Sequence, residues 1–90
     1  MNITRLDAKG SYTVVVLNDK KEIVVSKYLK EVEEKLPDNI FLRIHDSNTV
    51  NINYVRSYTN GRGGYIEMDD GTILNVSARR KDAFLTRFRQ

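Results

Sequence analysis

The sequence predicts a mainly β fold of several small antiparallel sheets, with one central amphipathic helix and a C-terminal helical segment of at most a turn or two. Three observations lead to this fold class. Short runs rich in β-branched and aromatic residues recur along the chain, turn residues separate them at intervals of about eight to twelve positions, and one segment has a clear helical period.

The first predicted element is a β-hairpin. Residues 14–17 are three valines and a leucine, a composition typical of a buried strand. The Asn, Asp and Lys at 18–20 have the chemistry of a turn, so residues 22–25 are expected to return as the second strand.

The central helix is predicted over residues 27–36. Ser26 is a suitable N-cap, and Leu29, Val32 and Leu36 fall on one face of a helix that begins there. Pro37 lacks an amide hydrogen and stops the helix. The result is an amphipathic helix of ten residues.

The second half of the chain is predicted to be β again, with one long and one tight hairpin connection. A glycine-rich loop at residues 60–64 joins one pair of strands, and an Asp-Asp-Gly turn at residues 69–71 joins the next. The predicted strands are residues 41–44, 49–52, 54–58, 64–68 and 72–76.

A final helical segment is expected after Ser77, which is a second candidate N-cap. Phe84, Leu85 and Phe88 share one face of such a helix. Lys81 falls inside the same apolar arc, so the segment is predicted to be short.

The length and composition favour a cytoplasmic recognition module. A chain of 90 residues fits one domain over residues 1–90, and it buries only about 60 to 65% of its unfolded surface, which leaves little room for a deep catalytic pocket. There is no cysteine, hence no disulfide and no thiolate metal site. The apolar runs at residues 14–17 and 23–25 are far too short to span a membrane.

The positive charge is concentrated at the carboxyl end. Lys and Arg number seven against seven Asp and Glu in residues 1–40, three against four in residues 41–78, and five against one in residues 79–90. Such a cluster fits contact with nucleic acid phosphates. On charge alone, an ordinary solvated basic tail explains it equally well.

One stretch carries a family signature. Residues 41–52 read Phe-Leu-Arg-Ile-His-Asp-Ser-Asn-Thr-Val-Asn-Ile, which resembles the Phe-x-Arg-x-His-x-Ser motif and the following Val-Asn strand of LytTR domains. Residues 7–12, the Glu-Glu-Lys-Leu that ends the predicted helix, and residues 70–77 followed by arginines resemble other parts of the same family. The similarity spans residues 3–88.

The resemblance implies a DNA-binding domain that reads double-stranded DNA with loops. Members of the family usually follow an N-terminal receiver domain in a bacterial response regulator. This domain is therefore expected either to be excised from a longer chain, which we favour, or to be a stand-alone regulator. They are expected to be monomers in the free state, to pair on direct repeats, and to contact two major grooves and the minor groove between them. The DNA-contacting positions that match here are Lys9, Gly10 and Ser11 in the first turn, Arg43, His45, Asp46 and Ser47 around the second, and Ser77, Arg79, Arg80 and Lys81 in the third.

All three loops depart from the family pattern. The first loop has a short hydroxyl at Ser11 where many members have a longer polar side chain. In the third, Ala78 stands where the family has arginine, so base reading is expected to shift to Arg79 and Arg80, whose guanidinium groups fit guanine O6 and N7.

The second loop differs by an acidic residue, Asp46, where members have Arg or Asn. A carboxylate is repelled by phosphates. It therefore accepts from a cytosine amino group, pairs with a donor such as Arg43, or points away from the DNA. Of these, we favour the ion pair with Arg43.

Other candidate chemistry has simpler explanations. The lone His45 is expected to hydrogen-bond its own corner, and Ser77 has no histidine partner for catalysis. The loop at residues 60–64 lacks the P-loop pattern, although Arg62 within it is placed to reach a phosphate. We therefore predict no catalytic residue, metal or cofactor. The rival hypotheses are a protein-interaction module of the same fold and an RNA-binding domain.

Overall fold

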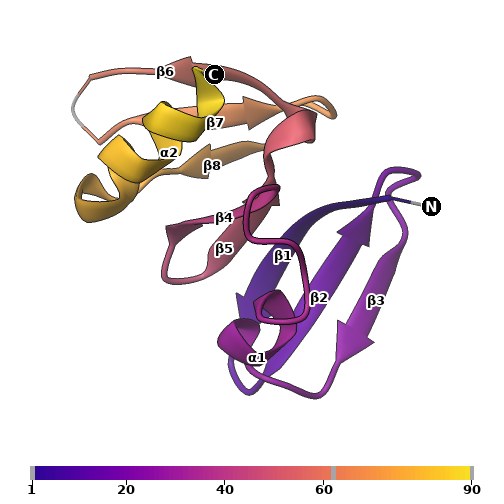
Figure 1. Cartoon of the computed structure of the whole chain (residues 1–90). Helices are drawn as coiled ribbons and strands as arrows, with labels where there is room; N and C mark the ends of the chain where they lie inside the picture. The colour runs from indigo at the N-terminus through magenta and orange to yellow at the C-terminus, as the bar shows by residue number, and fades with distance from the viewer. Residues whose placement is uncertain (1, 62, 90) are drawn as a thin grey trace.

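A computed structural model describes residues 2–61 and 63–89, and within them the chain forms two antiparallel sheets (Figure 1). The larger has five strands in the order β3-β2-β1-β5-β4, and the smaller has three in the order β6-β7-β8. The strands are β1 (Ile3–Lys9), β2 (Tyr12–Leu17), β3 (Glu22–Val25), β4 (Phe41–His45), β5 (Asn48–Asn51), β6 (Val55–Thr59), β7 (Tyr65–Met68) and β8 (Ile73–Asn75). The helical segments are α1 (Leu29–Glu33), the 3₁₀ turns η1 (Ile52–Tyr54) and η2 (Ala78–Arg80), and α2 (Lys81–Phe88).

Strand β1 joins the N-terminal hairpins to the middle of the chain. It pairs along one edge with β2 and along the other with β5, where Asp7 lies opposite Asn48. This pairing brings the end of β1 beside the turn between β4 and β5. Figure 1 shows β4 and β5 between the first three strands and the smaller sheet.

The hydrophobic core has two parts. One lies between α1 and the larger sheet and contains Leu6, Val15 and Leu29. The other is built by both sheets and by α2, and its fully buried members include Ile44 and Phe84. Burial of a side chain such as Phe84 contributes about 1.5–3 kcal/mol to folding, and Phe84 is the buried residue of α2 in this core.

The predicted mainly β fold is confirmed, and so is the hairpin of β2 and β3. The strands of the second half also form where the alternation predicted them, within one or two residues at their ends. Strand β1 was not predicted. Lys9, expected in the first turn, is the last residue of this strand, and the chain reverses only at Gly10 and Ser11.

The prediction of a ten-residue helix over residues 27–36 was wrong in its extent, because α1 has five residues. The hydroxyl of Thr13 donates to the carbonyl of Lys27 (2.8 Å), and the amide of Lys27 donates to the carbonyl of Val25 (2.8 Å). These bonds hold residues 25–27 against the sheet, so Tyr28 and not Ser26 precedes the helix. Beyond Glu33 the backbone tightens into i to i+3 bonds before Pro37.

The C-terminal helix is longer than predicted. After the η2 turn, α2 runs for eight residues. Lys81 does not interrupt its apolar face, because its amine leaves the core and donates to the Asn60 side chain (2.9 Å). Ser77 precedes η2, but its carbonyl oxygen, and not its hydroxyl, accepts the amide of Arg80 (3.0 Å). No helix in the described part of the chain is long and apolar enough to cross a membrane.

Candidate nucleic-acid interface

The first two predicted turns lie side by side at one end of the larger sheet. The amide of Ala8 donates to the carbonyl of Ser47 (2.8 Å), and the side-chain amide of Asn48 donates to the Asp7 carboxylate (2.8 Å). The first turn is tight, and Gly10 takes a φ of 64°, which glycine adopts without steric cost. These bonds place Lys9, Gly10 and Ser11 beside the turn that contains Asp46 and Ser47.

The third segment lies against the second turn from the other side. The amide of Ser77 donates to the carbonyl of Ile44 (2.8 Å), and the Arg79 guanidinium lies 3.4 Å from the Asp46 carboxylate. The turn at residues 45–47 is therefore the middle of a continuous strip, with residues 9–11 on one side and residues 77–81 on the other. We call this strip the three-turn edge.

The three-turn edge presents exposed polar side chains. Lys9, Ser11 and Ser47 are exposed, and the side chains of Asp46 and Arg79 keep 81% and 72% of their surface open to solvent. A pair so open to water contributes little to stability, so both groups are free to change partners when a ligand arrives.

Arg43 is held differently from the prediction. Its Nε and Nη2 donate to the two carboxylate oxygens of Glu33, at 3.0 and 2.8 Å, and its Nη1 donates to the carbonyl of Asp46 at 3.3 Å. The favoured ion pair between Arg43 and the Asp46 carboxylate is therefore wrong. Glu33 takes the planar fork of Arg43 with both oxygens, and Asp46 pairs with Arg79.

Glu33 balances the positive charges behind the edge. Burial acts to raise the pKa of its carboxyl, but hydrogen bonds from Arg43 and Thr49 and the charges of Arg43 and Arg80 together hold that pKa below its usual range. The hydroxyl of Thr49 donates to Glu33 at 2.6 Å. Glu33 is therefore ionised at neutral pH. Sequence reasoning missed it, because no local pattern links a helix residue to an arginine ten positions later.

Within residues 77–81, Ser77 and Arg80 have different surroundings from Lys81. Arg80 is half-buried, and within residues 2–61 and 63–89 its Nε and the hydroxyl of Ser77 are buried without a hydrogen-bond partner. Lys81 is directed by Asn60 toward the loop between β6 and β7. Arg62, in that loop, lies outside the described residues.

His45 has a local structural role. Its Nδ1 accepts the amide of Ser47 at 3.2 Å, which closes the turn as expected of a lone histidine at a strand end. Among the described residues, no group of three or more His, Asp and Glu side chains is arranged to hold a metal ion.

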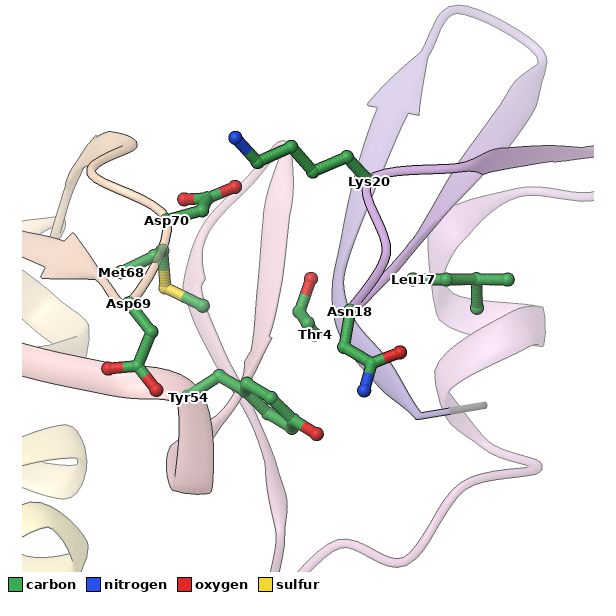
Figure 2. A pocket seen from close by; sticks show the side chains of 8 residues that line it. All are labelled: Thr4, Leu17, Asn18, Lys20, Tyr54, Met68, Asp69 and Asp70. Carbon is green, nitrogen blue, oxygen red and sulfur yellow. The ribbon is translucent and has the colours of Figure 1, made fainter.

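A pocket of about 240 Å³ lies at the opposite end of β1 and β2 (Figure 2). It is formed where the turn after β2 approaches η1 and the turn between β7 and β8, and none of the residues predicted to contact DNA line it. Its lining residues are Thr4, Leu17, Asn18, Lys20, Tyr54, Met68, Asp69 and Asp70. With two carboxylates and one amine, this pocket is a poor site for a polyanion.

Comparisons with known proteins identify both a matching family and a similar fold. The family model of the LytTr DNA-binding domain matches residues 1–89. Among solved structures, the fold is similar to the LytTr DNA-binding domain of a putative methyl-accepting/DNA response regulator from Bacillus cereus, with a TM-score of 0.79 and 28% sequence identity. That match covers 94% of this chain and 79% of the other. A comparison with curated proteins finds no match.

Proposed function

This chain belongs to the LytTR family of DNA-binding domains, and from that premise we propose that it binds specific double-stranded DNA sites through the three-turn edge. The family is a DNA-binding one and not a catalytic one. The observation that carries the proposal is the junction of three sequence-distant turns, through the Ala8–Ser47 and Ile44–Ser77 hydrogen bonds, into one exposed strip.

The side chains along this strip suit different parts of a duplex. Arg79 is more exposed than Arg80, and its fork fits the two acceptors of guanine in the major groove. Positive charge for the DNA phosphates comes from Lys9, Arg80 and Lys81. The short hydroxyl side chains of Ser11 and Ser47 can donate hydrogen bonds to the sugar-phosphate backbone of the DNA. In this arrangement the outer turns enter successive major grooves, and the middle turn faces the minor groove.

The size of the domain fits one turn of DNA. Its longest dimension is 34 Å, close to the rise of about 34–36 Å in one helical turn. Two copies placed on direct repeats would therefore cover neighbouring turns without overlap. The domain is proposed to be monomeric when free and to pair only on such sites.

The proposal includes a regulatory context. The matched Bacillus cereus domain is described as part of a response regulator. We place the present domain as the output half of a cytoplasmic transcription regulator whose activity is set by an N-terminal receiver domain.

Selection of bound sequences from a random duplex library tests the proposal directly. We expect a direct repeat with a spacing of about one helical turn, and an affinity for it that falls steeply as salt rises. Arg80→Ala should weaken binding to every duplex and reduce the slope of log affinity against log salt by about one. Failure to enrich any sequence, together with a flat salt response, would contradict the proposal and favour a protein partner.

A further inference from the structure

A network of hydrogen bonds connects α1 to the middle of the three-turn edge. Glu33, the last residue of α1, accepts two hydrogen bonds from Arg43 on β4 and one from Thr49 on β5. Arg43 in turn donates to the carbonyl of Asp46. Arg43 thus links the carboxylate of Glu33 to the backbone of the central turn. Glu33 itself lies behind that turn and not on its exposed surface.

We infer that Glu33 is a positioning residue for DNA recognition: through Arg43 it sets the conformation of the turn at residues 45–47, and with it the placement of Asp46 and Arg79. This inference rests on the proposed function. It also gives Arg43 a supporting role in place of direct DNA contact, since the Arg43 side chain keeps only 18% of its surface exposed and three of its nitrogens already have partners.

The turn at residues 45–47 needs such support. The pairing of β4 with β5 shifts register between Arg43 and His45, so the regular ladder is broken where the turn begins. The bond from Arg43 to the Asp46 carbonyl fixes the peptide at the centre of the turn, whereas the Asp46 side chain is held only by an exposed contact with Arg79. Without the fork of Glu33, Arg43 would be free to turn toward solvent, and the Asp46 carbonyl would lose its donor.

A loss of positioning can be distinguished from the loss of the Glu33 charge, because the two affect DNA binding differently. Removing the negative charge of Glu33 makes the domain more positive, which by itself strengthens binding to any duplex. Loss of positioning has the opposite effect, and it acts only on the specific site. The two effects therefore move the specific and the nonspecific affinity in different directions.

The experiment measures the affinity of the wild-type domain, Glu33→Gln and Glu34→Gln for the selected site and for a random duplex of equal length. Glu34 is the matched control, because it is the next residue, at the C-cap of the same helix, carries the same charge and is exposed. For Glu34→Gln both affinities should rise by a similar small factor. For Glu33→Gln the ratio of specific to nonspecific affinity should fall by about tenfold, the size of a lost base contact.

The ratio of specific to nonspecific affinity does not change if Glu33 only stabilises the folded domain. A variant that is partly unfolded loses both affinities in proportion to its folded fraction. A ratio for Glu33→Gln within about twofold of the wild type, in a domain that discriminates its site, would overturn the inference and leave the proposed function intact. A wild-type domain without discrimination would refute the proposed function itself.

Arg43→Lys provides a second, independent test should Glu33→Gln fail to fold. Lysine keeps the positive charge but cannot bind both oxygens of Glu33 and the Asp46 carbonyl together. The ratio should again fall by about tenfold, with the nonspecific affinity unchanged. An unchanged ratio in Arg43→Lys would also overturn the inference.

Discussion

The two ends of strands β1 and β2 are built from similar hairpin turns but carry different chemistry. At one end, the turn at residues 9–11 joins the three-turn edge, where exposed side chains project from three separate segments. At the other end, the turn at residues 18–20 borders a pocket that contains the carboxylates of Asp69 and Asp70. The backbone architecture is thus a poor guide to function, and the side chains that meet at each end decide it.

The two ends also differ in how their charges are held. Arg5 is mostly buried beside the pocket, where it pairs with Asp7 at 3.1 Å and lies 3.7 Å from Asp70. At the three-turn edge, Arg79 and Asp46 stay largely in water. The buried charges connect the two sheets, whereas the exposed ones remain available to a partner.

The largest effect is expected from the side chain that holds the third turn in place. Phe84→Ala should lower the free energy of unfolding by about 3–5 kcal/mol, because it empties a fully buried site between α2 and both sheets. Urea denaturation measures this loss. Val24→Ala, at a side chain that is 63% exposed, should change stability by about 0.5 kcal/mol or less. Equal losses in the two variants would show that α2 is not fixed as described.

A pair of charge-matched variants tests the difference between the ends. Arg79→Ala should weaken binding to the selected site by about 1–3 kcal/mol, because the proposed bidentate contact with guanine would be lost. Lys21→Ala removes the same charge at the pocket end, where the lysine side chain is 79% exposed, and should change the affinity by about twofold or less. Fluorescence anisotropy at fixed salt compares them. Similar losses would mean that the ends do not differ in DNA binding.

A smaller effect, on the pH dependence of stability, is expected at the pocket end. The backbone amide of Thr72 donates to Asp70 (2.9 Å), and this bond, helped by the charge of Arg5, lowers the pKa of Asp70 below its usual 3.8. Because the pKa of Asp70 is lower in the folded state, its ionised carboxylate stabilises the fold above pH 3.8. This stabilisation is lost as the pH falls from 3.8 through the folded-state pKa. Asp70→Ala should therefore be less stable than the wild type at pH 7, with a gap that narrows below pH 3.8. Urea midpoints across this range measure it, and a constant gap would contradict the assignment.

The smallest effect concerns the exposed pair at the three-turn edge. Asp46→Ala should change the free energy of unfolding by about 0.5 kcal/mol or less, because both Asp46 and Arg79 remain mostly hydrated. A thermal melt provides the measurement. A loss above 2 kcal/mol, on the order of a buried ion pair, would show that the turn is closed and not open to a ligand.

Much of the fold could be predicted from local patterns, but β1 could not. Its residues alternate between apolar and charged types, and the charged ones include Arg5 and Asp7. These two are mostly buried because they pair with each other and approach the turn between β7 and β8. Only the tertiary structure supplies those partners, so no local pattern in residues 3–9 predicted a strand.

The three turns could be located from the sequence, but the contacts between them could not. The family signature identified all three turns, and the structure places them on one edge. The partner of Asp46 was mistaken because Arg43 is close in sequence, whereas Glu33 and Arg79 approach from α1 and η2. Side-chain pairing between elements depends on how they pack, and spacing along the chain does not reveal it.

The pairing of β1 with β5 has a consequence for folding. The Ala8–Ser47 bond closes a loop of about forty residues, so its entropic cost must be met before the first and second turns can meet. Contacts of such high sequence separation slow folding and tend to form late. During synthesis, the three turns can therefore meet only after the carboxyl-terminal half of the chain has emerged.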